Sequence, residues 1–367
     1  MADAELLSLS GLASLREHAV AWDDLWSRSV TASPTCRAEL MVLWVERFAL
    51  NSEFRALVVQ RQGRWVAALP LVSRRLSRIG AAAGLPVNDW SQCGDLLLDE
   101  SADVEETLRC LASGFGQLPW SLLWLDGARI ETFRWQRLQH VLEKSGCKVV
   151  SESRFNVGWL ELKPRFDEQQ KCWSKGFRKD LRRSQRRLAE QGHLELKLHT
   201  DMGASDLEGL FDRVLQVDQQ SWKAKSGTAI QDSEGLADFY LSQARQLAAH
   251  RELVLAFLEL EDQPIAFEIG WLAKSVYHSF KVGFDQRFAK YSPGQLMMSL
   301  LIEEMIRASH ATAIDCIGPL SEATERFLPG SYTIGRMLIA NPASWTGRGM
   351  LSLYGNLMPL LRRVRDS

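Results

Sequence analysis

Cysteine is scarce in this chain, and its copies are scattered. The six cysteines occur without a Cys-x-x-Cys pair and without a nearby pair of histidines. That spacing supports neither a zinc site nor a framework of disulfides, and it is typical of proteins in a reducing cytosol. We therefore expect a cytoplasmic protein that holds no metal ion.

Long apolar runs and an excess of one charge are also missing. No window approaches the roughly 18 uncharged apolar residues of a membrane span, and the first residues lack the basic and apolar segments of a secretory signal. The sequence therefore predicts neither a membrane-spanning helix nor a leader. The formal net charge of −1 argues against a general affinity for DNA or acidic membranes, so we expect no DNA partner.

The chain has enough apolar material for two domains. Of its 367 residues, 46% are hydrophobic and 24% are charged, as in soluble globular proteins. A β-hairpin pattern with a polar turn at residues 61–64 is repeated with a turn at residues 261–264, and helical patterns precede both. The chain is therefore predicted to contain two weakly similar α+β modules, residues 1–150 and 151–345, followed by a helical tail at residues 346–367.

The strand–loop–helix pattern at residues 275–309 is the most informative stretch. Its strand ends near Asp285, and Ser292, Pro293 and Gly294 open the helix. The first N–H groups of a helix have no acceptor within it, and the helix dipole adds positive charge there. Such a start can hold a phosphate or pyrophosphate, although Ser-Pro-Gly is also an ordinary way to begin a helix.

A basic segment at residues 171–187 lies between the modules. It carries eight lysine or arginine side chains, while Phe177, Leu181 and Leu188 recur at helical spacing. This pattern predicts an amphipathic helix with a cationic outer face. That face is either simply solvated or a surface for nucleotide phosphate, tRNA or an acidic glycan; its few aromatic residues argue against single-stranded nucleic acid.

Several segments together resemble a known family. They are Phe177–Arg183 with Leu188 and Gly192, Gln220–Lys223, Pro264–Ala266, Phe284–Asp285 and Tyr291–Leu296. They resemble the CelD-type acetyltransferase-like proteins of cellulose and exopolysaccharide biosynthesis, a branch of the GNAT superfamily related to the Fem-type aminoacyltransferases. The resemblance implies an α+β fold of two tandem GNAT-like modules, each a mixed, mostly antiparallel sheet flanked by helices.

One segment departs from the family pattern. Many relatives carry Gly-x-x-x-Tyr-Lys after the strand that corresponds to residues 313–317, whereas residues 318–327 of this chain contain no Tyr-Lys pair. The role of that pair cannot be transferred, so the identity of the acceptor stays open.

The resemblance implies an acyl-CoA co-substrate, with acetyl-CoA preferred. Its pyrophosphate would rest on backbone amides at the Ser-Pro-Gly helix start, and its thioester would lie along residues 276–285, where neighbouring strands separate. The predicted cofactor-binding residues are Arg287, Lys290, Ser292, Gly294, Gln295 and Leu296. The first module lacks an equivalent helix start, so we expect it not to bind the cofactor.

Four side chains are candidates for proton transfer, and each has a structural alternative. Asp285 ends a strand but can cap its loop, and Tyr291 can pack on that loop. Glu268 and His278 lie in apolar strands, where Glu268 is either buried with a raised pKa or turned to solvent, and His278 suits the core. The predicted catalytic residues are Asp285, Glu268, His278 and Tyr291, and the predicted substrate-binding residues are Trp222, Lys223 and Lys281.

The faces of the strand at residues 276–285 follow from strict alternation. Alternation places Tyr277, Ser279, Lys281, Gly283 and Asp285 on one face and His278, Phe280, Val282 and Phe284 on the other. No serine or cysteine has an adjacent base in the sequence, so we expect direct attack of an amine or hydroxyl on the acyl thioester.

Three functions remain open. The first is an acyl-CoA-dependent N- or O-acyltransferase that acts on a small molecule or glycan, such as a sugar or polysaccharide precursor, near the polysaccharide-synthesis machinery. The second is a Fem-like aminoacyltransferase that uses aminoacyl-tRNA, with residues 171–187 on the tRNA. The third is a catalytically degenerate scaffold in polysaccharide biosynthesis. The oligomeric state is left open.

Overall fold

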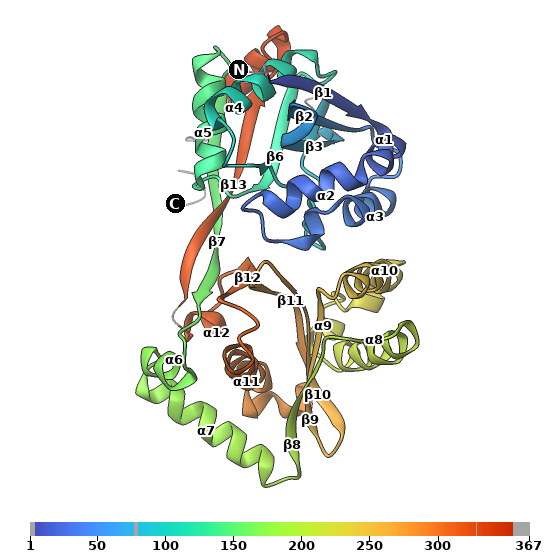
Figure 1. Ribbon diagram of the computed structural model, residues 1–367. Coiled ribbons are helices and arrows are strands. Elements are labelled where there is room, and N and C mark those ends of the chain that lie inside the picture. The colour runs from blue at the N-terminus through green and yellow to red at the C-terminus, as the bar shows by residue number, and fades with distance from the viewer. Residues whose placement is uncertain (1–3, 77–79, 328, 355–367) are drawn as a thin grey trace. The chain divides into compact units, whose positions relative to one another are not determined.

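The chain folds into two compact units, which we describe separately. The computed structural model describes residues 4–76, 80–327 and 329–354. Unit 1 comprises Met1–Phe155 and Thr333–Ser367, and unit 2 comprises Asn156–Tyr332. Each unit has its own set of helices and contributes its own strands to the sheet, in the orders given below (Figure 1).

Unit 1 is built on a mixed sheet in the order β1-β2-β3-β4-β6-β13-β7. Its strands are β1 (Glu5–Ser10), β2 (Phe54–Arg61), β3 (Arg64–Leu76), β4 (Gly80–Gly84), β5 (Leu97–Leu98, paired with β3), β6 (Leu122–Ala128), and parts of β7 (Val149–Glu161) and β13 (Gly330–Ala340). Its helices are α1 (Gly11–Glu17), α2 (Ala19–Arg28), η1 (Pro34–Cys36), α3 (Ala38–Phe48), α4 (Val104–Ser113), η2 (Gly114–Gln117) and α5 (Phe133–Lys144).

Unit 2 is built on a mixed sheet in the order β7-β12-β11-β10-β9-β8. Its further strands are β8 (Leu194–His199), β9 (Leu253–Leu260), β10 (Gln263–Ala273), β11 (Val276–Phe284) and β12 (Ala313–Pro319). Its helices are α6 (Phe166–Cys172), α7 (Lys175–Ala189), α8 (Ala204–Gln219), α9 (Trp222–Lys225), η3 (Ile230–Asp232), α10 (Leu236–Ala249), η4 (Gln286–Tyr291), α11 (Pro293–Arg307) and α12 (Glu322–Glu325).

The two sheets repeat one pattern of pairing. In unit 1, β1 to β4 pair antiparallel in succession, β4 pairs parallel with β6, and β6 pairs antiparallel with β13. In unit 2, β8 to β11 pair antiparallel in succession, β11 pairs parallel with β12, and β12 pairs antiparallel with β7. The predicted α+β fold of two similar modules, each with a mixed and mostly antiparallel sheet, is confirmed.

The last strand of each sheet comes from an unexpected part of the chain. The sequence assigns residues 151–345 to the second module, but residues 333–345 belong to unit 1, because β13 pairs with β6 through Gly335–Ala340. Likewise β7 begins in unit 1, and its residues from Val157 onward pair with β12. Each unit is therefore completed by a strand that follows the other unit in the sequence.

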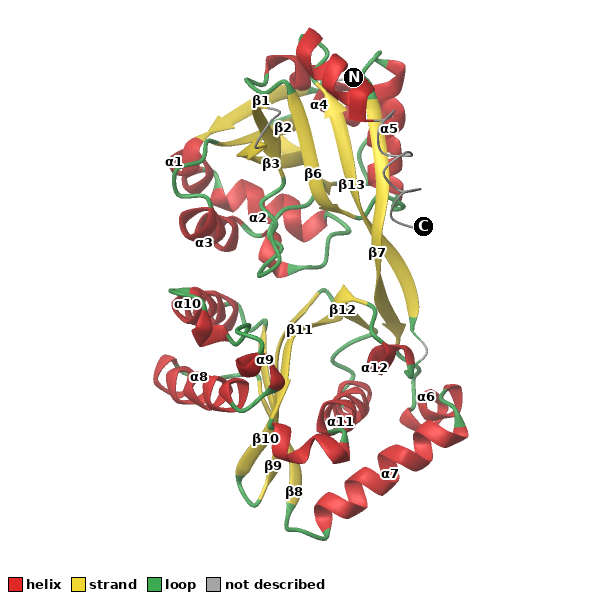
Figure 2. Cartoon of the chain, turned by 180° about the vertical axis from the view of Figure 1, so that it is seen from behind, coloured by secondary structure: helices red, strands yellow, loops and turns green. Residues whose placement is uncertain are grey.

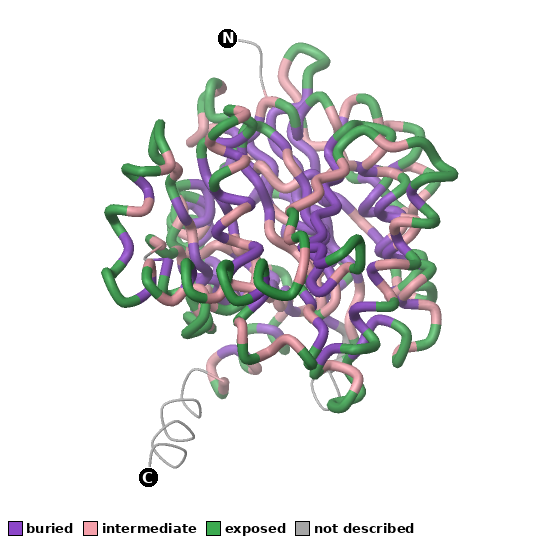
Figure 3. The backbone as a smooth tube through the Cα atoms, turned by 90° about the horizontal axis from the view of Figure 1, so that it is seen from below, coloured by how far each residue is buried: buried purple, intermediate pink, exposed green. Residues whose placement is uncertain are grey.

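The helices of unit 2 cover both faces of its sheet. Helices α7 and α11 lie on one face, whereas α8 and α10 lie on the other (Figures 1 and 2). In Figure 3 the buried residues run along the strands, and the exposed residues follow the outer turns of the helices. Both faces of β9 are therefore buried, which explains its continuous apolar run.

Most predicted elements are confirmed, with one change in the basic segment. The hairpins β2–β3 and β9–β10 turn where the sequence indicates. The single helix expected over residues 171–187 is instead divided into α6 and α7, because Trp173 enters the core and Ser174 caps α7 by accepting a hydrogen bond from the Phe177 N–H at 3.1 Å. Of the predicted tail, residues 346–354 are helical, and the rest lies outside the described residues.

An aromatic cluster anchors α7 on unit 2. The centroid of the Phe177 ring lies 4.9 Å from that of Phe327, in a T-shaped arrangement, and 5.8 Å from that of Trp173. We predict that Phe177→Ala lowers the free energy of unfolding by about 3–5 kcal/mol, because it leaves a cavity and removes ring contacts. Urea unfolding measures the change. Phe177→Leu, which keeps most of the volume, should cost clearly less; equal costs would contradict a role in packing.

Candidate functional site

The site begins where two parallel strands separate. Strands β11 and β12 pair at three positions only, from Val276 opposite Ala313 to His278 opposite Asp315. Beyond that point Ser279 to Phe284 of β11 have no partner on β12, and the space between the strands opens into a cavity. The separation expected along residues 276–285 is therefore present.

The buried side chain of Asp315 lies where β11 and β12 separate. Its carboxylate accepts hydrogen bonds from the Ile317 N–H at 3.0 Å and from the Tyr332 hydroxyl at 2.8 Å, and it lies 3.6 Å from the ring of His278. Ile317 has a φ of +55°, which is uncommon for a β-branched residue. The carboxylate thus stabilises a tight turn that redirects β12 away from β11.

The cavity has a volume of about 790 Å³ and belongs entirely to unit 2. Its wall is formed by β11 and the end of β12, the first turn of α11, α9 and the segment around α12. The residues that line it include Trp222, Lys223, Glu268, Ser279, Phe280, Lys281, Phe284, Ser292, Gly294, Gln295, Met298, Cys316 and Phe327.

A β-bulge at Phe280 changes which residues of β11 share a face. On β10, Gly270 lies opposite Ser279, and its neighbour Ile269 lies opposite Lys281. Phe280 therefore has no partner on β10 and is an extra residue on β11. Strict alternation is therefore wrong beyond Ser279, because a bulge reverses the faces of the residues that follow it. Val282 and Phe284 share the face of Tyr277 and Ser279, whereas Lys281 turns to the other face, 5.3 Å from the ring of Tyr240.

Glu268 is a buried carboxyl at the cavity wall. The residue is only 1% exposed, and its Oε1 accepts a hydrogen bond from the Tyr277 hydroxyl at 2.9 Å. Burial raises the pKa of Glu268 to about 7, while hydrogen bonds from Ser279 and Tyr277 oppose that rise. The carboxyl therefore changes protonation near neutral pH, as a general acid or base requires.

The first turn of α11 presents unpaired amides to the cavity. Ser292 adopts the left-handed conformation, its N–H donates to Ala289, and the Leu296 N–H donates back to Ser292. Pro293 has no N–H, so the amides of Gly294 and Gln295 are the first-turn groups without an acceptor in the helix. Gly294 and Gln295 line the cavity at the positive end of the helix dipole.

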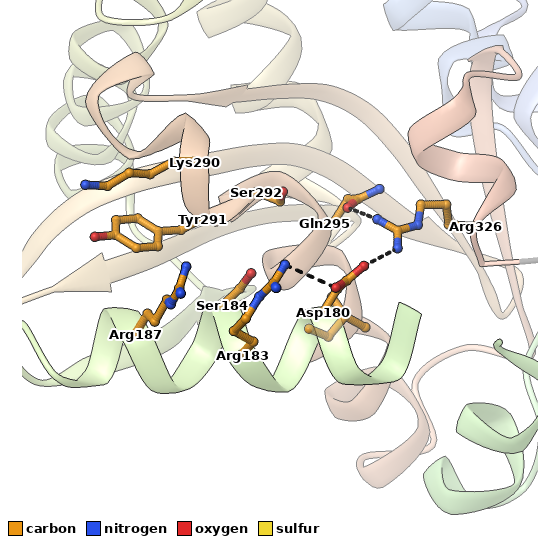
Figure 4. A pocket seen from close by; sticks show the side chains of 10 residues that line it. Asp180, Arg183, Ser184, Arg187, Lys290, Tyr291, Ser292, Gln295 and Arg326 are labelled. Carbon is orange, nitrogen blue, oxygen red and sulfur yellow. Dashed lines mark hydrogen bonds and ion pairs between the residues drawn. The ribbon is translucent and has the colours of Figure 1, made fainter. Parts of the chain in front are cut away.

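A second, basic pocket of about 180 Å³ adjoins the same turn (Figure 4). Arg183 and Arg187 rise from α7 toward Tyr291 and Ser292, and Arg326 lies beside Gln295. The lining residues are Asp180, Leu181, Arg183, Ser184, Arg187, Lys290, Tyr291, Ser292, Gln295 and Arg326. Ser292 and Gln295 line both the cavity and the basic pocket, so the two spaces meet at the start of α11.

Most predicted site residues lie in these two spaces. Trp222, Lys223, Glu268 and Lys281 line the cavity with Ser292, Gly294 and Gln295, whereas Lys290 and Tyr291 line the basic pocket. Lys223 donates from Nζ to the Val282 carbonyl at 2.6 Å. Burial, assisted by the charge of Lys223, lowers the pKa of Lys281 to about 8.

Four predicted residues lie elsewhere or have their polar atoms engaged. Asp285 is 2% exposed and caps η4, accepting from the Arg287 N–H at 2.9 Å and from its Nε at 2.8 Å. Arg287 is thereby held away from both spaces. His278 is fully buried beside Asp315, behind the wall, and the side chain of Leu296 belongs to the core, so only its backbone is near the site.

Sequence reasoning missed several residues of the site. Tyr277 and Ser279 support Glu268, but alternation alone did not pair them with it across the hairpin. Cys316 and Phe327 line the cavity although the chain departs from the family pattern around them. Arg183 and Arg187 were visible as part of a basic helix, and their i, i+4 spacing signals one shared face.

Comparisons with known proteins agree with this geometry. Residues 175–322 match the family model of the acetyltransferase (GNAT) domain. That range includes α7, the β8–β12 strands and α11, which carry most of the residues that line the cavity and the basic pocket; Arg326 and Phe327 lie beyond it. The prediction of a GNAT-like transferase is confirmed. No curated protein matches the chain.

Solved structures share the fold at low sequence identity. FemX has a TM-score of 0.62 and 11% identity, with 92% of this chain and 98% of FemX covered. The C-terminal domain of a putative lysylphosphatidylglycerol synthetase from Agrobacterium fabrum has a TM-score of 0.53 and 14% identity, with 92% and 95% covered. A conserved protein of unknown function from Bacteroides thetaiotaomicron has a TM-score of 0.54 and 11% identity, with 93% and 100% covered.

None of the helices in the described residues is long and apolar enough to cross a membrane.

The burial of Glu268 makes the stability of the protein depend on pH. The folded state keeps this carboxyl protonated up to a pH of about 7, whereas the unfolded chain ionises near 4.5. The folded state then binds more protons, so this contribution to stability falls as the pH rises from about 4.5 to about 7. The loss is on the order of 3 kcal/mol.

We predict that Glu268→Gln removes this contribution. Urea unfolding of both proteins at pH 5 and at pH 8 should show that the variant gains stability relative to the wild type at the higher pH. A constant difference between the two proteins across that range would show that Glu268 is ionised in the folded protein at low pH.

Proposed function

We propose that the chain is an acyl-CoA-dependent N- or O-acyltransferase in which unit 2 carries the reaction and unit 1 binds no cofactor. Acetyl-CoA is the preferred donor, and the acceptor is an amine or hydroxyl of a sugar or polysaccharide precursor. The observation that carries the proposal is the junction of the cavity, with the titratable carboxyl of Glu268 at its wall, and the free amides at the start of α11.

The shape and chemistry of the cavity suit the donor. The thiol-bearing arm of CoA is long and largely uncharged, and it matches an opening between β11 and β12 that includes Phe280, Phe284 and Met298. The pyrophosphate carries the negative charge that the amides of Gly294 and Gln295 favour. The arm and the pyrophosphate are adjacent in the molecule, as the cavity and the helix start are adjacent here.

Glu268 supplies the proton acceptor in the proposed reaction. The nucleophilic nitrogen or oxygen of the acceptor bonds to the acyl carbon, its proton passes to Glu268 directly or through a water, and the bond from carbon to sulfur breaks. The thiolate that leaves then takes up a proton. Tyr277 and Ser279 orient the carboxyl, so that it faces the cavity ready for this transfer.

Unit 1 offers a different electrostatic environment at the corresponding position. Between its parallel strands β4 and β6 runs α4, as α11 runs between β11 and β12. The start of α4 is already occupied by carboxylates: Asp103 caps it by accepting from the Glu106 N–H at 3.0 Å, and Glu105 lies in the same turn. These charges repel a phosphate, which supports the assignment of the cofactor to unit 2.

The acceptor side of the cavity has an aromatic entrance. Trp222 lines the cavity and is 52% exposed, and Lys223 lies next to it. An exposed indole face suits the apolar face of a sugar ring. This feature, together with the CelD-type sequence pattern, supports a glycan acceptor and a role beside the cytoplasmic polysaccharide-synthesis machinery.

A second candidate is a Fem-like aminoacyltransferase that uses aminoacyl-tRNA. The fold likeness to FemX favours it, as does the exposed basic surface of α7 outside the pockets, formed by Lys175, Lys179 and Arg186. Tight tRNA binding that weakens steeply with salt, without affinity for acetyl-CoA, would favour this candidate. Binding of neither ligand would favour a scaffold without catalysis.

We predict that acetyl-CoA binds with micromolar affinity and that Gly294→Glu abolishes binding. The glutamate places a negative charge where the pyrophosphate would rest. Titration calorimetry with acetyl-CoA measures both proteins. Unchanged affinity in the variant would contradict the placement of the pyrophosphate on α11.

Two matched variants separate charge from bulk at this position. A Cβ atom on Gly294 would lie 3.6 Å from the Phe284 ring and 4.0 Å from Val282, which are ordinary contacts, so Gly294→Ala should fold normally and retain affinity. Gly294→Gln has the size of glutamate without its charge. It should bind more weakly than the wild type and more tightly than Gly294→Glu.

We also predict that the turnover of acetyl-CoA rises with pH and levels off above about 7, because Glu268 must be ionised to accept a proton. Release of free thiol, followed across a panel of amino sugars, measures turnover without a need to identify the product. Glu268→Gln should lower the rate by about 10²–10⁴-fold and leave acetyl-CoA affinity nearly unchanged. A Gln variant with the wild-type rate and pH profile would exclude Glu268 as the base.

A further inference from the structure

The basic pocket on α7 has no role in the acyl transfer itself. It holds four cationic side chains (Arg183, Arg187, Lys290 and Arg326) against one carboxylate, that of Asp180. Arg183 and Arg187 are one helical turn apart on the same face of α7, whereas Lys290 comes from η4. Cations from separate elements therefore converge on one space, which is an arrangement for an anion of more than one charge.

We propose that this pocket binds the 3′-phosphate at the nucleotide end of CoA, and that it thereby selects free acyl-CoA over acyl donors that lack this phosphate. The inference rests on the proposed function and names a second recognition site for the same donor. Two of its arginines, Arg183 and Arg187, lie on α7, and the third, Arg326, follows α12, so all three lie outside the strand–loop–helix unit that holds the pyrophosphate.

The order of the subsites follows the order of groups in CoA. The cavity, with its carboxyl and aromatic walls, leads to the start of α11, and the basic pocket lies on the other side of that start, sharing Ser292 and Gln295 with the cavity. CoA has the same sequence of parts: a thiol arm, a pyrophosphate and a phosphorylated nucleoside. A ligand that lies in the cavity with its pyrophosphate on Gly294 and Gln295 thus directs its last phosphate into the pocket.

Two of the four pocket cations, Arg183 and Arg326, are held in place before any ligand binds. Asp180 accepts from Arg326 at 2.7 Å and from Arg183 at 3.2 Å, and Arg326 also lies 3.3 Å from the Gln295 side-chain oxygen (Figure 4). Arg326 additionally covers the ring of Phe177 at 4.3 Å. In Figure 4, Arg187 lies below the Tyr291 ring and Lys290 lies above it, both away from Arg326, so the phosphate would be received between this fixed network and adjustable charges.

The test compares acetyl-CoA with 3′-dephospho-acetyl-CoA by titration calorimetry on the full chain. We expect the wild type to bind acetyl-CoA about tenfold more tightly, which corresponds to one or two charge-assisted hydrogen bonds at an exposed site. The double variant Arg183→Gln/Arg187→Gln should reduce this ratio toward one, chiefly by weakening the binding of acetyl-CoA. Lys290→Gln, on a separate element, should reduce the ratio in part.

The matched control is Lys179→Gln/Arg186→Gln, which removes the same charge from α7 at exposed positions outside the pocket. It should keep the wild-type ratio. Any of three outcomes would overturn the inference while leaving the proposed function intact: the wild type binds both compounds equally tightly, the affinity ratio survives in Arg183→Gln/Arg187→Gln, or the control loses that ratio equally. Absence of binding to either compound would instead refute the proposed function.

Discussion

The separation of β11 from β12 is the constraint on which the rest of the site depends. Two parallel strands normally continue their ladder, yet here the pairing stops at His278 and Asp315. The stop is stabilised by the buried Asp315, which binds the backbone of Ile317 and the hydroxyl of Tyr332 and thereby turns β12 aside. Because the pairing stops there, the cavity can extend along β11 from Ser279 to Phe284. His278, a catalytic candidate in the sequence, is fully buried beside Asp315 and is not among the residues that line the cavity.

The repeated fold shows how two copies of one topology acquire different surface chemistry. Both units place a helix after the fourth strand of the sheet and return to a parallel fifth strand. The difference lies in the first turn of that helix. In α11 it contains proline, glycine and glutamine and faces a basic helix, whereas in α4 it contains Asp103, Glu105 and Glu106. Because carboxylates neutralise the positive end of a helix, the same backbone that attracts an anion in unit 2 repels one in unit 1.

Local patterns in the sequence predict the elements well and the long-range pairing poorly. The hairpins β2–β3 and β9–β10 follow from alternating residues around polar turns, and the start of α11 follows from Ser292, Pro293 and Gly294. The sequence does not show which unit β7 and β13 pair with, because the residue pattern of a strand does not depend on the partner strand that it joins. The bulge at Phe280 is equally hidden, because an extra residue is defined only by its partner strand, β10. One bulge was enough to move Lys281 to the opposite face and to bring Val282 beside Glu268.

Burial links the stability of unit 2 to its proposed chemistry. An ionised Glu268 would be strongly disfavoured between β10 and β11, so the fold keeps the carboxyl neutral until the pH approaches 7. If hydrogen-bond donors fully compensated for the water that Glu268 loses on burial, its pKa would be lower and the carboxylate would be a weak base. The hydroxyls of Tyr277 and Ser279 compensate only in part, which leaves the carboxyl balanced between its two forms near neutral pH. The same desolvation that costs stability above that pH therefore gives Glu268 the basicity that a proton acceptor needs, and the open edge of β11 gives an acceptor molecule access to it.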